Sequence, residues 1–118
     1  MSRFLLAIKS SISKKPSTFF LDEIDNGLSG KSLLSLAKLI KAISKNQQVL
    51  CITHQPFLAA AGLAHFKVNK KVINGITYTS IKKLTTKNQR KKELIELIGG
   101  GFGEANDYAS RLLDRAAA

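Results

Sequence analysis

Cysteine is almost absent from this chain, which has 118 residues and a single cysteine, Cys51. One thiol excludes an internal disulfide and any metal site built from several cysteines. Cys51 lies inside the apolar run Val49–Ile52, a setting that favours a buried structural thiol over a reactive one. We therefore expect Cys51 to have a packing role rather than a chemical one.

Long apolar runs are also missing. No stretch of eighteen consecutive apolar residues occurs, and positive charges interrupt the first twenty residues at Arg3, Lys9, Lys14 and Lys15. A membrane-spanning helix needs about twenty apolar residues, and a signal peptide needs an uninterrupted apolar segment. The sequence therefore predicts no membrane partner and no secretion, and it favours a cytoplasmic protein.

Acidic residues are absent from a long part of the chain. No Asp or Glu occurs between Asn26 and Lys92, and this span carries thirteen Lys or Arg residues of a chain whose net charge is +11. Such a span is typical of a surface that faces DNA or other phosphate groups. It is equally typical of a solvated lysine-rich surface, or of a face that meets acidic residues on a partner. Composition alone leaves these alternatives open.

The sequence does contain alternating helical and strand patterns. Apolar residues at helical spacing predict a helix over residues 2–12, closed by Pro16, and another over residues 31–45. Short apolar runs at residues 18–21 and 48–53 predict two strands, with the pattern of strands buried on both faces. Strand, helix and strand in this order predict a right-handed crossover in a parallel sheet, so the expected fold class is α/β.

A second group of elements follows. A short helix is expected over residues 57–63, and the pair Asn74-Gly75 then predicts antiparallel strands, with a further turn near Asn69. The strands and the helices after them are expected at residues 64–69, 76–83, 87–98 and 103–115. Two parallel strands are too few for a stable doubly wound sheet. The order of elements therefore indicates the second part of a larger domain.

Residues 25–32, "DNGLSGKS", are similar to the end of a phosphate-binding loop. Such a loop has the form G-x-x-x-x-G-K-[ST], because backbone amides wrap the phosphates and the lysine reaches them. The end of this form fits, but its first glycine would stand at the position of Asp25. With Asp22 and Glu23 nearby, three carboxylates would face a triphosphate, and each close like-charge pair costs on the order of 1 to 4 kcal/mol. The sequence therefore disfavours this interpretation.

An apolar strand that ends in adjacent acids supports a different interpretation. Neighbouring side chains on a strand diverge, so Asp22 would face a Mg²⁺ ion while Glu23 faces the water that attacks a γ-phosphate. His54 follows the next predicted strand, and parallel strands joined by one helix end at the same edge of their sheet. Glu23 and His54 are thus expected to converge on one phosphate, whereas His65 has no such partner and is expected to be structural.

The segments "FFLDEIDNGLSG" and "QVLCITHQP" carry a family resemblance. They resemble the Walker B and switch-histidine segments of ABC-type ATPase heads, most closely those of the RecN family, bacterial relatives of the SMC proteins that act in DNA double-strand-break repair and recombination. The opening "MSRFLLAIKS" is similar to the helix that directly follows the LSGGE signature of this family. The tail from Lys92 to Gly100 resembles the family's C-terminus, so the resemblance covers nearly all of the chain.

This resemblance implies a fold and its division. The chain would be a partial P-loop NTPase, with residues 1–118 forming the C-terminal portion of one ABC-type ATPase head in a cytoplasmic, nucleoid-associated protein. Its parts would be a post-signature helix, a unit from Walker B to the switch histidine, antiparallel strands and C-terminal helices, at residues 1–15, 17–63, 64–84 and 87–116.

The resemblance also implies roles for individual residues. Asp22 would hold Mg²⁺, Glu23 would be the catalytic carboxylate that orients water, and His54 would contact the γ-phosphate of ATP. A D-loop would face the second head of a head-to-head dimer across the bound ATP, and it would consist of Asn26, Gly27, Leu28 and Ser29. Ser29 stands where most ABC proteins have the D-loop aspartate.

The phosphate-holding half of such a site is missing from the sequence. No phosphate-binding loop, Q-loop, LSGGE signature or coiled-coil heptads occur. We therefore predict that the chain alone neither binds ATP tightly nor hydrolyses it, and that its partners are the N-terminal half of the head, a second head and DNA. Two alternatives stay open. One is a non-catalytic basic module that binds DNA or another partner through the lysine-rich span, and the other is a small phosphotransferase that uses Lys31.

Overall fold

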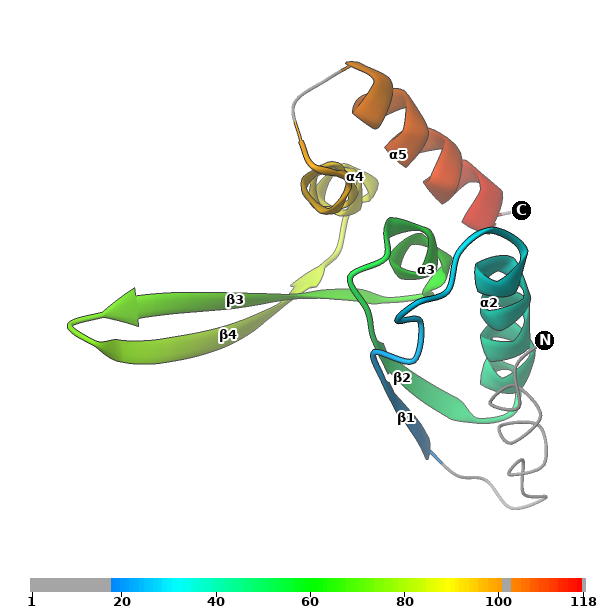
Figure 1. Cartoon of the computed structure of the whole chain (residues 1–118), viewed down its shortest axis with the longest axis horizontal. Coiled ribbons are helices and arrows are strands. Elements are labelled where there is room, and N and C mark those ends of the chain that lie inside the picture. The colour runs from blue at the N-terminus through cyan, green and yellow to red at the C-terminus, as the bar shows by residue number, and fades with distance from the viewer. Residues whose placement is uncertain (1–17, 101–102, 118) are drawn as a thin grey trace. The chain divides into compact units, whose positions relative to one another are not determined.

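The computed structural model describes residues 18–100 and 103–117. These residues form an α/β fold in the order β1, α2, β2, α3, β3, β4, α4, α5 (Figure 1). The chain divides into two compact units, one up to Leu58 and one from Ala59 onward. The helix expected over residues 2–12 lies outside the described residues.

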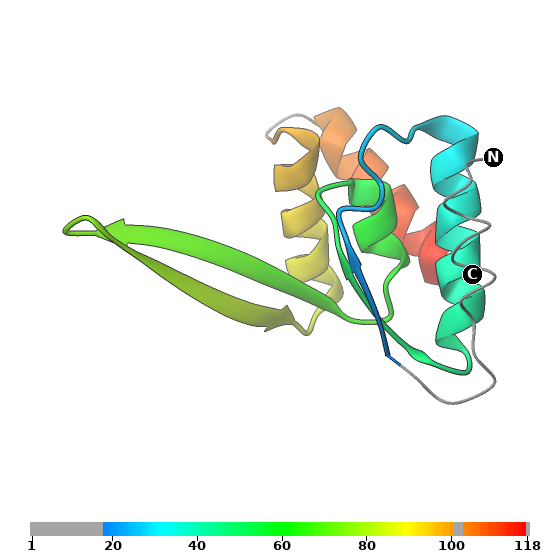
Figure 2. The ribbon, with the colours of Figure 1, turned by 60° about the horizontal axis from the view of Figure 1, so that its bottom comes forward.

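The first unit contains the predicted crossover. Strands β1, Thr18–Asp22, and β2, Gln48–Ile52, are direct neighbours and run parallel, with Thr18 opposite Gln48 and Asp22 opposite Ile52. The helix between them, α2, spans Gly30–Ser44 and runs alongside the two strands (Figure 2). The expected parallel pairing and the helix that joins the strands are both confirmed.

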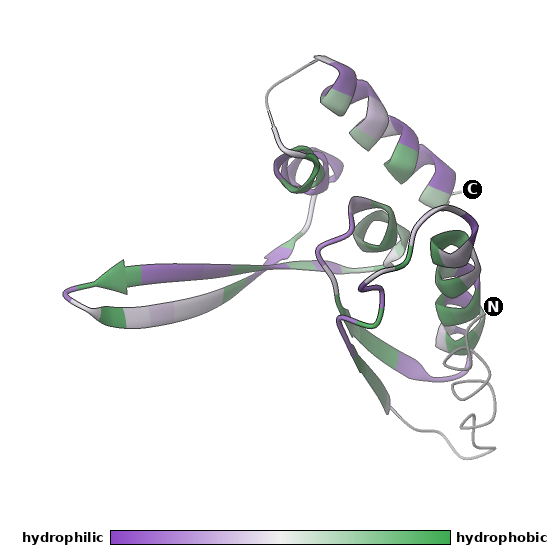
Figure 3. Cartoon of the chain, viewed as in Figure 1, coloured by the Kyte–Doolittle hydropathy of each residue, from purple (hydrophilic) through white to green (hydrophobic). Residues whose placement is uncertain are grey.

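Helix α2 forms because its apolar residues recur on one side. That side packs against β2, and the apolar stripe is visible in Figure 3. Lys41 in the last turn suits the negative end of the helix dipole. The buried residues of the helix are Leu33, Leu36, Ala37 and Ile43.

The expectation that both strands are buried on both faces is wrong for the described residues. Phe20 is 64% exposed, and its neighbours on the same face of the sheet, Leu50 and Ile52, are 44% and 45% exposed. Side chains alternate between the faces of a sheet, and α2 covers one face. The opposite face has no covering layer among residues 18–58, so only the side that carries Leu21 is buried there.

Helix α3, Pro56–Ala61, begins at the proline, whose missing N–H is harmless at a helix start. The Arg90 guanidinium caps the C-terminal end of this helix, which lies in the second unit. It donates hydrogen bonds to the carbonyl oxygens of Ala59, Ala60 and Gly62 at 3.3, 3.2 and 2.8 Å. One planar side chain thus satisfies carbonyl groups that a helix end leaves without intrahelical partners.

The second unit contains one long hairpin, formed by β3, His65–Ile73, and β4, Ile76–Leu84. Its turn is Asn74-Gly75, both with positive φ (51° and 76°), as a two-residue type I′ turn requires. The turn predicted near Asn69 is wrong, because Asn69 pairs with Ser80 inside the ladder. A strand tolerates a single asparagine when flanking residues keep the alternation.

Two helices follow the hairpin, as predicted: α4, Lys87–Ile98, and α5, Gly103–Ala117. Thr86 and Gln89 form a capping box at the start of α4, and Gly99 ends the helix in a left-handed conformation with φ 115°. The two helices pack together around Leu94 and the buried side of α5, which carries Ala105, Ala109, Leu112 and Leu113. None of the helices in the described part of the chain is long and apolar enough to cross a membrane.

Candidate functional site

The carboxyl ends of β1 and β2 form the candidate site. Asp22 is the last residue of β1, and Glu23 follows it directly. The Glu23 N–H donates a 2.9 Å hydrogen bond to the carbonyl oxygen of Ile52, the last residue of β2. His54 stands two residues beyond Ile52, so the structure brings Asp22, Glu23 and His54 to one edge of the sheet. The side chains of all three are exposed.

The backbone at Glu23 is unusual. Its φ is 49°, in the left-handed region that a residue with a side chain seldom adopts. The Glu23 carbonyl accepts a hydrogen bond from the Asn26 N–H at 3.3 Å, which closes a tight turn directly after β1. Residues held in such conformations cost about 1 to 3 kcal/mol each and cluster at functional sites. The turn directs the chain away from the sheet immediately after the two acids.

The residues expected to form a D-loop lie in this turn and just after it. Asn26, Gly27 and Ser29 are exposed, and Leu28 is half-buried. Gly27 has φ 76°, and a Cβ there would meet no atom within 4 Å, so the dihedral rather than lack of space favours glycine. Ser29 is the extended N-cap residue of α2, and its side chain makes no capping hydrogen bond. The loop thus presents polar groups to solvent beside Glu23.

Two residues that sequence reasoning did not assign to the site join its two loops. Asp25 is 0% exposed, and its Oδ2 accepts a hydrogen bond from the Thr53 hydroxyl. Thr53 lies between the last residue of β2 and His54. The available signal was weak: a third acid three residues after Asp22, and a hydroxyl directly before the histidine. Their contact spans 28 positions and depends on the pairing of β1 with β2.

Cys51 and His65 have environments that agree with structural roles. Burial first, and the Asp25 carboxylate second, raise the pKa of the Cys51 thiol to about 11. The thiol is therefore almost entirely protonated at neutral pH, which suppresses its reactivity. Burial is the main reason why the pKa of His65 is lowered, followed by the positive charge of Arg90. His65 belongs to the second unit, at the start of β3.

The acids after β1 fit a magnesium ion in their donor chemistry. Carboxylate oxygens are ligands that Mg²⁺ prefers, and it commonly takes only one or two from the protein while phosphate and water supply the others. Within residues 18–100 and 103–117, no three side chains of His, Cys, Asp or Glu gather as a complete metal site. The Asp22 carboxylate fits an ion whose other ligands are phosphate and water oxygens.

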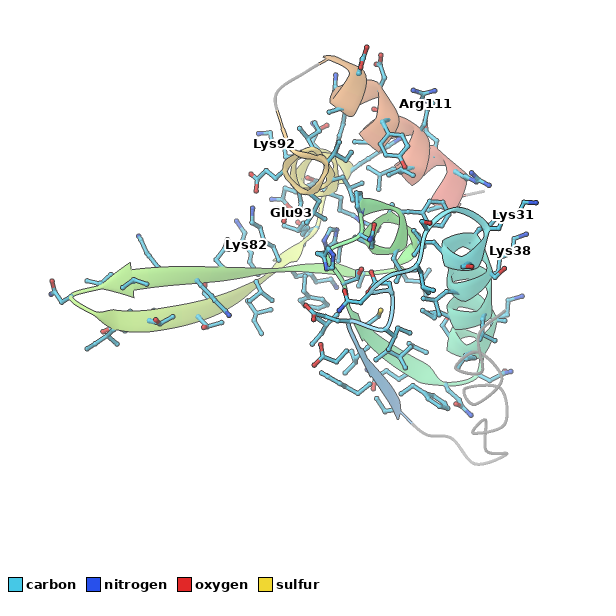
Figure 4. All side chains as sticks on the ribbon, in the orientation of Figure 1. Lys31, Lys38, Lys82, Lys92, Glu93 and Arg111 are labelled. Atoms are coloured by element: carbon cyan, nitrogen blue, oxygen red, sulfur yellow. The ribbon has the colours of Figure 1, made fainter. Side chains whose placement is uncertain are left out.

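Lys31 does not lie where a phosphate-binding lysine is needed. It occupies the first turn of α2, and Figure 4 shows Lys31 and Lys38 on the side of the helix that faces away from β1 and β2. The carboxylates and His54 follow those strands, so Lys31 lies away from them within this unit. The structure thus gives the phosphotransferase alternative no support.

Comparison with known proteins places the chain in a class. Residues 1–60 match the family described as "AAA domain, putative AbiEii toxin, Type IV TA system". The chain therefore contains an AAA-type ATPase domain segment, in agreement with its parallel strands and crossover helix.

Relatives define the family more narrowly. The chain is 41% identical over 136 aligned residues to the DNA repair protein RecN of Synechocystis sp., with all of the chain and 23% of that relative covered. The DNA repair protein RecN of Aquifex aeolicus is 37% identical, with 97% of the chain and 22% of that relative covered. The protein of the same name from Deinococcus radiodurans is 30% identical, with 96% and 20% covered. The chain belongs to the RecN family, and it spans about a fifth of the length of these relatives.

Proposed function

We propose that this chain supplies the hydrolytic residues of a RecN-type ATPase head that acts in the repair of DNA double-strand breaks and in recombination. The observation that carries the proposal is the hydrogen bond from the Glu23 amide to Ile52, which keeps the acids after β1 beside the segment that carries His54. The relatives' name as DNA repair proteins and the AAA-type match support the same function.

Each residue has a role in this proposal. Asp22 holds Mg²⁺, which when bound neutralises negative charge on the phosphate oxygens of ATP. Glu23 accepts a hydrogen bond from the attacking water and orients it. His54 donates a hydrogen bond to the γ-phosphate. The exposed loop of Asn26, Gly27, Leu28 and Ser29 faces a second head in a head-to-head dimer.

The proposal requires a contribution from the rest of a RecN protein. Backbone amides and a lysine that hold the phosphates are needed for tight nucleotide binding, and this sequence has no such loop. In this proposal, that half comes from the part of a RecN protein that the chain does not cover. We therefore expect isothermal titration of the 118-residue chain with MgATP to detect no micromolar binding. Micromolar binding by the chain alone would contradict the division of the site.

The test of the hydrolytic role is Glu23→Gln in a complete RecN protein that carries this segment. We expect the rate of ATP hydrolysis to fall by about 100-fold or more, because the amide cannot take up the proton of water. ATP-dependent association of heads is expected to remain. Glu104→Gln, which changes an exposed acid of α5 in the same way, is the control and should leave the rate unchanged. Turnover that survives Glu23→Gln would remove Glu23 from the mechanism.

A second candidate function is DNA binding by the hairpin. Directly opposite residues of antiparallel strands share a face, so the pairing of β3 with β4 sorts their side chains onto two faces. One face, called the polar face, carries Ile73 and Ile76 beside the turn and His65 and Leu84 at the other end, and between them Lys67, Asn69, Lys71, Tyr78, Ser80 and Lys82. The other face, called the apolar face, carries Phe66, Val68, Val72 and Ile81 together with Lys70, Thr77, Thr79 and Lys83. Figure 3 shows apolar and polar stretches following one another along the hairpin.

Only part of the polar face is available to a polyanion. Lys67 Nζ lies 2.5 Å from a Glu93 carboxylate oxygen and 2.6 Å from one of Glu96, and these hydrogen bonds raise the pKa of Lys67. Lys71 and Lys82 are exposed and make no such ion pair with any residue that the structure describes. Lys82 lies near the end of the hairpin where Glu93 is found (Figure 4). A two-stranded ribbon fits the major groove of DNA, and lysines of this kind bind its phosphates.

A further inference from the structure

Asp25 is the one charged side chain that is fully buried in the described part of the chain. It is 0% exposed, whereas its neighbours Asp22 and Glu23 are exposed. An aspartate is seldom fully buried, because a carboxylate loses its hydration and needs compensating hydrogen bonds. The hydrogen-bond partners of Asp25 therefore indicate why its side chain is buried.

The Asp25 side chain contacts the segment that carries His54. The Thr53 hydroxyl donates a hydrogen bond to Asp25 Oδ2, and the same hydroxyl accepts a 3.0 Å hydrogen bond from the backbone N–H of Gln55. Thr53 and Gln55 are the residues on either side of His54. The hydroxyl thus uses its donor and its acceptor to fix both neighbours of the histidine to one carboxylate.

The Asp25 backbone belongs to the turn that carries the catalytic acid of the proposed function. Its carbonyl oxygen accepts a 3.0 Å hydrogen bond from the Leu28 N–H, and the preceding carbonyl of Glu23 accepts one from Asn26 at 3.3 Å. The same residue therefore stabilises the turn after β1 with its main chain and holds the segment after β2 with its side chain.

The second carboxylate oxygen of Asp25 argues against a role in stability alone. Oδ1 is buried and has no hydrogen-bond partner among the described residues. A buried, half-paired carboxylate is a costly way to hold two loops together, since apolar residues of similar volume often stabilise a protein as well or better. What a carboxylate adds is a directed, charge-assisted hydrogen bond that fixes the geometry of its partner.

We infer that Asp25 is a positioning residue, which acts through Thr53 to hold the His54 segment in one geometry relative to Glu23. This inference deepens the proposed function and rests on it for the consequence in hydrolysis. Asp25 itself contacts neither the phosphate nor the attacking water. It keeps the imidazole and the carboxylate, which come from different loops, from moving independently.

The first test measures the connection in the 118-residue chain, without nucleotide. Thr53→Val keeps the shape of the side chain but removes the hydroxyl, whereas Thr53→Ser retains it. We expect Thr53→Val to raise the amide hydrogen-exchange rate of Gln55 by about tenfold, because that N–H loses its acceptor. The amide resonance of His54 should shift or broaden at the same time. Thr53→Ser should restore both the exchange rate of Gln55 and the amide resonance of His54. Asp25→Asn should shift or broaden the His54 resonance but leave the exchange rate of Gln55 unchanged, because the Thr53 hydroxyl still accepts from the Gln55 N–H.

The second test measures the consequence in a complete RecN protein that carries this segment. Thr53→Val is expected to lower kcat by about 10- to 100-fold, since small displacements of catalytic groups have effects of this size. KM should change much less than kcat, because the phosphate-holding half of the site, and not the single His54 contact, supplies most of the affinity for ATP. Thr53→Ser should restore kcat. An unchanged exchange rate of Gln55 in Thr53→Val would overturn the connection. A loosened His54 segment with unchanged kcat would overturn the positioning role while leaving the proposed function intact.

Discussion

The strand-end loops of the first unit and the hairpin of the second unit are specified in opposite ways. In the loops, residues 23–28 and 53–55 are joined by a buried carboxylate, and one backbone hydrogen bond ties Glu23 to β2. In the hairpin, β3 and β4 pair only with each other among the described residues, and apolar side chains stand exposed on both faces. The first region is fixed by contacts within this chain.

The difference shows which region of this chain depends on a partner for its stability. An isolated two-stranded hairpin is marginally stable in water, and exposed apolar residues in a row mark a surface that contacts a partner. The strand-end loops already have their internal partners. We therefore expect the geometry around Glu23 and His54 to be present in the chain alone. The stability of the hairpin, in contrast, is expected to depend on contact with the surface of a partner. Each of the following predictions tests that contrast.

The largest effect is expected in the core beneath the loops. Leu36 in α2 is 0% exposed, so Leu36→Ala should lower the free energy of unfolding of the first unit by about 2 to 5 kcal/mol, through lost apolar contacts and the cavity left behind. Ile81 in the hairpin is 69% exposed, and Ile81→Ala should change stability by about 0.5 kcal/mol or less. Amide exchange in increasing urea reports the two units separately. Equal losses would show that the hairpin is covered in solution.

The second largest effect is expected in thiol reactivity. Because the pKa of Cys51 is raised from 9.0 to about 11, its thiolate fraction below pH 9 should be about 100-fold lower than that of an ordinary thiol. A cysteine at the exposed hairpin position Ser80, in a chain with Cys51→Ala, supplies the ordinary thiol for comparison. Alkylation rates measured against pH should give midpoints about two units apart.

The charge of Asp25 provides an internal check on that midpoint. Its carboxylate disfavours the thiolate, so Asp25→Asn should lower the pKa of Cys51 and increase the alkylation rate at pH 8. Thr53→Ser keeps both the carboxylate and the hydroxyl and should leave the rate unchanged. A Cys51 that reacts as fast as the hairpin thiol would show that the strand ends open in solution, and the contrast between the two regions would disappear.

The sequence predicts the regular elements well because local patterns specify them. The helical spacing of Leu33 and Leu36 fixes α2, and Asn74-Gly75 fixes the hairpin turn, since few residue pairs adopt positive φ twice. Periodicity does not report which face of a strand is covered, so the apolar run of β1 does not by itself indicate that the face with Phe20 is exposed. That exposure agrees with the expectation that apolar faces made for a missing part of the domain are uncovered. The alternation around Asn69 outweighs its turn preference.

The candidate site was predicted in part for a related reason. The order of strand and helix is enough to bring Glu23 and His54 to one edge of a sheet. It does not say that β1 and β2 are direct neighbours, which is what places Asp25 within reach of Thr53. A hydrogen bond between residues 28 positions apart depends on the order and the register of the strands. Neither can be determined from a single sequence.

The smallest effect is expected in DNA binding by the hairpin. Lys71→Gln with Lys82→Gln removes two charges from the polar face, and Lys70→Gln with Lys83→Gln removes two from the apolar face. Both double variants lower the net charge from +11 to +9. If the polar face binds the phosphates, the first variant should weaken binding of duplex DNA by about tenfold and reduce its salt slope by about two. The second should bind within about twofold of the unaltered chain, as its lysines face away from the DNA.

Because the two variants carry the same charge on the same strands, they separate a specific face from general attraction. Fluorescence anisotropy at several salt concentrations gives both affinity and slope. Equal losses in the two variants would mean that net charge alone attracts DNA, and the hairpin would then have no binding face. A greater loss in Lys70→Gln with Lys83→Gln would assign DNA to the side that carries Phe66 and Val68. The exposed apolar residues of that side would then contact DNA and would not be free to bind a protein partner.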